Sequence, residues 1–207
     1  MLLRLTDARI ASKVDLPPQP TPWRIGVDNS GASLPLARRC AVTADLVAAA
    51  LDLAGQSALP AADGQLVSVW VGGVSGADGA IWVQPGGVTG EFGGIDDASW
   101  RVLCLQQHYR APLAIDSAAR GRARTSLLRL QRAYRNLLRV APGGSPSRPL
   151  SVQSQRFEGQ LHAALLDDLA TPEALSIVAQ VLEHDIEPGE QLHLLLRASR
   201  LLGLALT

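Results

Sequence analysis

The stretch WRVLCLQQHYRAPL, residues 100–113, decides the fold of this chain. Its apolar residues recur at helical spacing as far as His-Tyr-Arg, and the Ala-Pro that follows stops the helix. A glycine-rich region with strand-like segments precedes the stretch, and an arginine-rich helical segment follows it. We therefore predict an α/β part over residues 1–95 and an α-helical part over residues 96–207.

The composition is typical of a globular protein. The 207 residues are 47% hydrophobic and 18% charged, which is enough to form the core of one or two small domains. No apolar run reaches about 18 residues, so we predict no membrane-spanning helix. The N-terminus lacks the basic and apolar segments of a signal peptide. With only two cysteines, these features favour a cytoplasmic location.

The cysteines and histidines do not form a recognisable site. Cys40 and Cys104 lie in apolar helical segments, and we interpret them as buried thiols rather than a nucleophile pair. Residues 108, 162, 184 and 193 are histidines on separate predicted helices, without the local spacing of metal ligands. We therefore predict no metal site.

Charge is unevenly distributed along the chain, although the net charge is zero. Residues 101–148 carry ten arginines and one acidic residue, whereas the segments on either side are acidic. On the predicted helix, one group of side chains is a candidate phosphate-binding stripe: Arg124, Arg129, Arg132, Arg135 and Arg139. The alternative is a solvated face that pairs with the acidic flanks. Only Tyr134 lies among these arginines, so base stacking is not indicated.

The N-terminal half predicts a strand–loop–helix unit. The predicted elements are a strand at residues 23–27, a turn (DNSGAS) at 28–33, a helix at 37–54 ended by Gly55, and strands at 66–71 and 80–83. Such a unit places ligands between the end of the strand and the start of the helix. Because DNSGAS lacks GxGxxG and GK[ST], we favour a tight turn over a phosphate-binding loop.

The C-terminal half predicts four more helices after the one that begins at Asp96–Asp97. They are a helix capped by Asp116 that ends near Val140, a helix at 153–169, a helix opened by Thr171 as N-cap with Pro172 after it, and a helix at 190–202; a loop covers 141–147. Asp167 and Asp168 are adjacent carboxylates. On a helix they would point about 100° apart, so we predict a loop-and-cap role rather than an acid/base pair.

Two segments resemble the cysteinyl-tRNA synthetase family. His108-Tyr109-Arg110 with Pro112-Leu113 is similar to the family's His-Tyr-Arg-Ser-Pro-Leu, with Ala111 in place of serine. LDDLATPEAL, residues 166–175, is similar to the family's Asp-Asp-Asp-Phe-Asn-Thr-Pro-Glu-Ala-Leu. The resemblance implies a reduced Rossmann-like sheet of the nucleotidyl-transferase type, followed by a helical bundle that resembles the stem-contact region. Because the sequence stops just after the helix at 190–202, we expect the family's anticodon-recognising extension to be absent.

The catalytic signatures of that family are missing. The resemblance places the His-Ile-Gly-His signature at Leu34 to Ala37 and the zinc cysteine near Asp28 or Ile25. The Lys-Met-Ser-Lys-Ser signature should follow Asp78-Gly79, where the chain has AIWVQPG. These replacements cannot aim positive charge at a phosphoryl transition state. We therefore interpret Asp28, Leu34 and Ala37 as a degenerate nucleotide site, and predict no catalytic residues and no cofactor.

These observations favour a non-catalytic paralogue of the synthetases. We expect a pseudoenzyme with a binding or regulatory role, which contacts tRNA or another polyanion through the arginines, or else a protein partner or a second copy of itself. One alternative is a ligase that activates an amino acid for a small acceptor, as do the similar cysteine ligases of mycothiol biosynthesis, although those retain both nucleotide signatures. Another alternative is a structural or dimerisation module.

Overall fold

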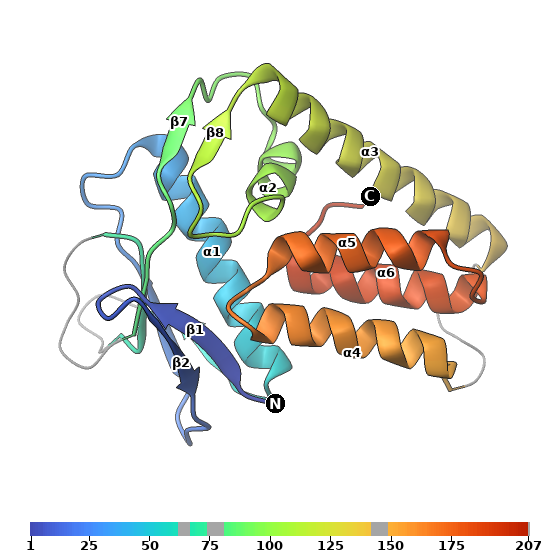
Figure 1. Ribbon diagram of the computed structural model, residues 1–207, viewed down its shortest axis with the longest axis horizontal. Coiled ribbons are helices and arrows are strands. Elements are labelled where there is room, and N and C mark those ends of the chain that lie inside the picture. Colours follow the sequence, from blue (N-terminus) through green and yellow to red (C-terminus); the bar gives the residue numbers. More distant parts are fainter. Residues whose placement is uncertain (62–66, 74–80, 142–148, 207) are drawn as a thin grey trace.

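The computed structural model describes residues 1–61, 67–73, 81–141 and 149–206. It is a mixed α/β fold in which a small parallel sheet is followed by a region of packed helices (Figure 1). The sheet is compatible with the predicted Rossmann-like arrangement. None of the helices in the described ranges has the length and apolar composition needed to cross a membrane.

The main sheet contains four parallel strands in the order β4-β3-β5-β6. These strands are β3 (Trp23–Val27), β4 (Ala58–Pro60), β5 (Val69–Val71) and β6 (Ile81–Val83). β3 has the predicted bounds, and β5 and β6 lie within the predicted segments, of which residues 66 and 80 fall outside the described residues. Because β4 and β5 lie on opposite sides of β3, the carboxyl end of β3 is a topological switch point, where α/β sheets bind ligands.

Helix α1 (Leu34–Leu53) follows β3 and packs against the sheet. It begins three residues earlier than predicted, because Pro35 in its first turn has a backbone angle suited to a helix start. Gly55 ends it with a left-handed φ of 76°, as the sequence predicted. The other face of α1 contacts α4 (Val152–Leu166) and α6 (Pro188–Leu202), so that the sheet and the helices share one hydrophobic core. The boundary between residues 95 and 96 stays a prediction.

Two short sheets flank the main one. Strands β1 (Leu3–Asp7) and β2 (Ser12–Leu16) form an antiparallel hairpin, and β7 (Val88–Gly90) pairs in parallel with β8 (Leu113–Ile115). Helix α2 (Asp97–Leu105) lies between β7 and β8 in the chain. Asp96 caps it by accepting a hydrogen bond from the backbone nitrogen of Ser99 at 2.8 Å.

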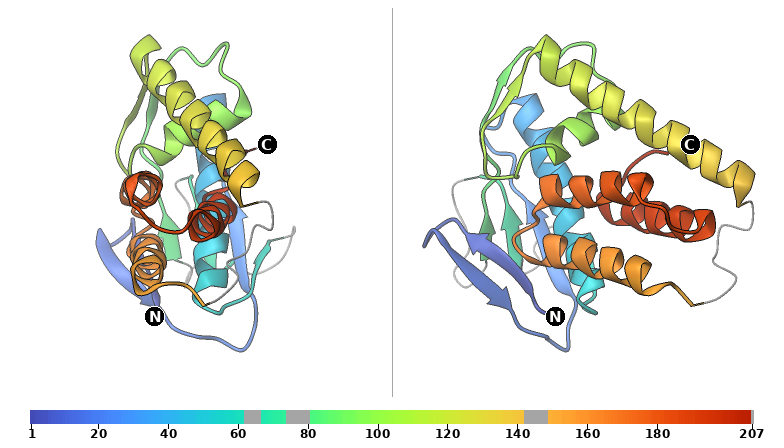
Figure 2. Two further views of the ribbon diagram at one scale, coloured as in Figure 1. Left: turned by 90° about the vertical axis from the view of Figure 1, so that its right-hand side faces the viewer. Right: turned by 45° about the vertical axis from the view of Figure 1, so that its right-hand side comes forward.

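The remaining helices pack on one another. In Figures 1 and 2, α4, α5 (Thr171–Glu183) and α6 run alongside one another, and α3 (Ser117–Val140) crosses them at an angle. Asp116 caps α3 as predicted, accepting from the backbone nitrogen of Ala119 at 2.6 Å. Thr171 does not cap α5: Ala170 holds the N-cap position, and Thr171 is the buried first residue of the helix. Pro172 lies in the first turn, as predicted.

The carboxylate of Asp168 joins three distant segments. It accepts hydrogen bonds from the backbone nitrogen and the hydroxyl of Thr6, both at 2.8 Å, and from the Tyr109 hydroxyl at 2.7 Å. The guanidinium of Arg110 lies 3.0 Å from the same carboxylate. The Nε2 atom of His108 lies 2.9 Å from the backbone oxygen of Asp168. We call these residues the Asp168 clasp; it ties β1, the loop before β8 and the turn between α4 and α5 together.

The predicted capping role of Asp168 is wrong, because its carboxylate binds Thr6 and Tyr109 rather than the end of a helix. The residue does lie in a turn, with a left-handed φ of 60°, but its side chain is only 2% exposed and bonds to segments far away in the chain. A left-handed backbone costs about 1–2 kcal/mol for a residue with a Cβ, and the hydrogen bonds to the buried carboxylate offset it. Asp167 is different, because its side chain is 54% exposed and pairs with Lys13 at 2.7 Å.

The clasp predicts unequal effects for two neighbouring substitutions. Asp168→Ala removes the shared acceptor and leaves buried donors unpaired, so we expect it to lower the free energy of unfolding by about 3 kcal/mol or more. Asp167→Ala is the matched control, and should cost less than about 1 kcal/mol because its ion pair is exposed. Urea unfolding followed by circular dichroism measures both. Equal losses in the two variants would contradict the role given to Asp168.

Two half-buried histidines predict a fall in stability below neutral pH. Burial lowers the pKa of His108, against the opposing effect of the Asp168 charge, and burial likewise lowers the pKa of His162. Protonation of either ring therefore favours the unfolded chain, so that the stability these groups contribute is present above about pH 6.5 and is lost as the pH falls below it. Urea unfolding at pH 7.5 and 5.5 should show this loss, and the double variant His108→Gln/His162→Gln should show a smaller one. If the double variant loses as much stability between pH 7.5 and 5.5 as the wild-type chain does, the two rings are not the cause of the loss.

Candidate functional site

The predicted nucleotide corner lies at the carboxyl end of β3, where Asp28 begins the loop to α1. The Asp28 carboxylate accepts from the backbone nitrogen and hydroxyl of Ser30 at 2.9 and 2.6 Å, and these hydrogen bonds lower its pKa. A fixed negative charge here opposes phosphate binding. Gly73 approaches so closely that a Cβ there would lie 1.9 Å from the Asp28 carboxylate. Leu34 is 66% exposed and Ala37 is half-buried, and neither side chain supplies charge.

The two arginine side chains at the start of α1 contact other segments of the chain rather than the nucleotide corner. Arg38 forms an ion pair with Asp97 and lies over the Phe92 ring, 4.8 Å from its centroid. Arg39 is 1% exposed and donates to the backbone oxygens of Gly86 at 2.8 Å and His108 at 3.1 Å. Both side chains therefore contribute to packing between α1 and the following segments. The predicted turn at Asp78-Gly79 and Ala80 lies outside the described residues, and the next three residues form β6.

The two thiols are buried and free, which confirms their structural interpretation. Burial raises the pKa of Cys40, and it raises the pKa of Cys104 to about 12. A thiol that stays protonated at neutral pH is a poor nucleophile. Within the residues that the structure describes, no three or more histidine, cysteine or acidic side chains are grouped to hold a metal ion.

Helix α3 divides the predicted arginines into two groups. At about 100° per residue, four of them fall within an arc of about 80°, away from the buried side of the helix: Arg124, Arg132, Arg135 and Arg139. All four are exposed, and none forms an ion pair with another described residue. We call these four residues the arginine face. Arg129 lies to one side of the arginine face and pairs with Glu183 of α5 at 2.6 Å. Pairing with the acidic flanks was the alternative interpretation of the whole predicted stripe, and among its five arginines the described ion pairs show it for Arg129.

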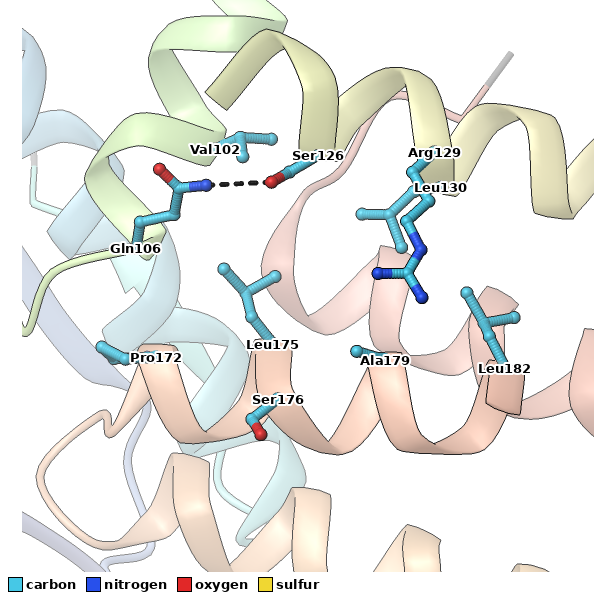
Figure 3. A pocket seen from close by; sticks show the side chains of 10 residues that line it. All are labelled: Val102, Gln106, Ser126, Arg129, Leu130, Pro172, Leu175, Ser176, Ala179 and Leu182. Carbon is cyan, nitrogen blue, oxygen red and sulfur yellow. Dashed lines mark hydrogen bonds between the residues drawn. The ribbon is translucent and has the colours of Figure 1, made fainter. Parts of the chain in front are cut away.

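A cavity of about 260 Å³ lies between α2, α3 and α5, beside Arg129 (Figure 3). Its lining is mainly apolar and consists of Val102, Gln106, Ser126, Arg129, Leu130, Pro172, Leu175, Ser176, Ala179 and Leu182. Gln106 donates to the Ser126 hydroxyl at 3.1 Å, at the end of the cavity opposite Arg129 in Figure 3. We refer to this cavity as the α3/α5 pocket.

The α3/α5 pocket is not among the sites predicted from the sequence, although α5 carries a signal for it. The buried side of α5 consists of Ala174, Ile177, Val178 and Val181. Leu175, Ala179 and Leu182 form a second apolar stripe at spacing i, i+4 and i+7, and they are only half-buried. A second stripe of this kind indicates a face that the rest of the fold does not fully cover.

Comparison with known proteins gives a distant relationship. No family model matches the chain. A cysteine–tRNA ligase from Novosphingobium aromaticivorans is 32% identical over 116 residues, which is 55% of this chain and 23% of the ligase. The chain is therefore distantly related to a class of aminoacyl-tRNA ligases. It corresponds to less than a quarter of the length of this relative.

Proposed function

We propose that this protein is a synthetase-related binding protein without aminoacylation activity, which contacts tRNA through the arginine face of α3. The observation that carries the proposal is the exposure of Arg124, Arg132, Arg135 and Arg139 on one side of a helix, without carboxylate partners among the described residues. Because the whole chain has zero net charge, this concentration of cations is local. Neutralising phosphates with such a face releases counterions, which drives association with nucleic acids.

The geometry of the helix suits a run of phosphates. Arg132 and Arg139 lie seven residues apart, which is about 10 Å along the helix axis, with Arg135 between them. A nucleic-acid backbone can therefore contact more than one of these guanidinium groups, each of which can donate two hydrogen bonds to a phosphate. With only Tyr134 as a nearby aromatic residue, we propose that binding depends on the backbone of the RNA rather than on its sequence.

The proposed lack of catalysis is supported by the charges at the former nucleotide corner. Adenylate formation requires cations aimed at the phosphates, whereas Asp28 is a carboxylate, and Arg38 and Arg39 are bound to other parts of the chain. We propose that residues 1–95 are a shortened remnant of the synthetase catalytic domain. The helices α2 to α6 then correspond to the helical bundle that follows it, in a protein of the cytoplasm.

Charge reversal on α3 tests the proposed interface. Arg132→Glu/Arg135→Glu should weaken binding to total tRNA by at least about tenfold at 50 mM salt, and should reduce the slope of log K against log salt by roughly 1–2. The matched control is Arg156→Glu/Arg200→Glu, which makes the same change in net charge at exposed sites on α4 and α6. Filter binding measures both. The proposed interface is wrong if the wild-type chain does not bind tRNA at low salt. It is also wrong if the two double variants lose affinity for tRNA equally.

Exchange of pyrophosphate into ATP tests the loss of activity. We expect no exchange above the protein-free background with cysteine or any other amino acid, because the corner lacks cations for the phosphates. An active cysteine–tRNA ligase, assayed in parallel, is the control for the reagents. Amino-acid-dependent exchange by the purified chain would support the alternative ligase function instead.

A further inference from the structure

The α3/α5 pocket has the size and lining of a small-ligand site. An apolar cavity of about 150 Å³ is large enough to bind benzene, and the present one measures about 260 Å³. Its walls include Leu130 from α3 and the second apolar stripe of α5, namely Leu175, Ala179 and Leu182. Because Leu175, Ala179 and Leu182 are partly exposed, covering them would remove apolar surface from water. The lining therefore favours a ligand with an aliphatic part.

Two opposite charges lie together beside this apolar surface. The guanidinium of Arg129, which lines the pocket, is 2.6 Å from the Glu183 carboxylate, and their side chains are 60% and 62% exposed. An ion pair so open to water contributes little to stability, so a ligand can separate its members at small cost. A guanidinium has five N–H donors and a carboxylate has two acceptor oxygens, so both groups can bind further partners.

We propose that the α3/α5 pocket binds a free aliphatic α-amino acid. The ligand carboxylate lies on Arg129, its ammonium group on Glu183, and its side chain against Leu130, Leu175 and Leu182. A simple carboxylic acid would meet the like charge of Glu183, and a simple amine would meet that of Arg129. A zwitterion complements both charges, and an aliphatic side chain complements the apolar walls. This site is separate from the arginine face and does not depend on the proposed RNA contact.

Titration with leucine and its fragments tests the ligand class. We expect saturable binding of leucine to the wild-type chain, with a Kd on the order of 1 mM. Each of three probes lacks one feature and should bind at least about fivefold more weakly: 4-methylpentanoate lacks the ammonium group, 3-methylbutylamine lacks the carboxylate, and glycine lacks the side chain. Chemical-shift changes in NMR spectra of the labelled protein measure all four affinities. If 4-methylpentanoate binds as tightly as leucine, the zwitterion is the wrong ligand.

Substitutions in the pocket test its location. Ala179→Phe fills the space between Leu175 and Leu182 and should abolish leucine binding. Arg129→Gln and Glu183→Gln change exposed side chains, and each should weaken binding by at least about fivefold. Arg156→Gln on α4 removes an exposed charge outside both proposed sites; it is the control and should leave the Kd unchanged. Absence of saturable leucine binding to the wild-type chain, or unchanged binding by both Arg129→Gln and Ala179→Phe, would overturn the proposal.

Discussion

The buried carboxylate of Asp168 is the interaction on which the arrangement of this chain depends. An ionisable group that is only 2% exposed is costly unless donors surround it. Here the donors come from Thr6 in the N-terminal hairpin and from Tyr109 and Arg110 in the loop before β8. If any one of these segments moved away, the carboxylate would lose partners in a place that water does not reach. Three segments far apart in the chain are therefore held in one relative position.

That position determines the two surfaces to which we assign binding. Tyr109 and Arg110 precede α3 by only a few residues, and Asp168 lies three residues before α5, so the clasp connects the approaches to both helices. From there α3 crosses α5 at an angle (Figure 1), and the α3/α5 pocket lies between them. The outer side of the same helix carries the arginine face. One long helix thus separates a surface suited to phosphates from a pocket suited to a small ligand.

Local signals made the described helices and the strands β3, β5 and β6 predictable, whereas β2, β4, β7 and β8 were not predicted. The bounds of β3 and the start of α3 at its Asp116 cap follow from patterns of a few residues. The sequence could not assign the partners of Asp168, because Thr6 and Tyr109 are 162 and 59 residues away from it. The sequence also could not show that Arg129 differs from the other arginines of the predicted phosphate-binding stripe. Arg129 pairs with Glu183, which lies on another helix and 54 residues further along the chain. Contacts between distant residues therefore limit what the sequence predicts, and a local pattern can also be wrong, since Ala170 rather than Thr171 holds the N-cap position of α5.

Burial also explains which parts of the synthetase pattern this chain retains. The two segments that resemble the family, around Tyr109 and around Asp168, meet in the clasp, where a change would leave charges or donors buried without partners. The positions that the resemblance assigns to the His-Ile-Gly-His signature are less constrained, because Leu34 is 66% exposed and Ala37 is half-buried, so replacing them costs little stability. Substitutions at these signature positions are thus compatible with the fold, whereas substitutions in the clasp are not. A protein under selection for folding and binding alone would keep the residues of the clasp and could lose those of a nucleotide signature.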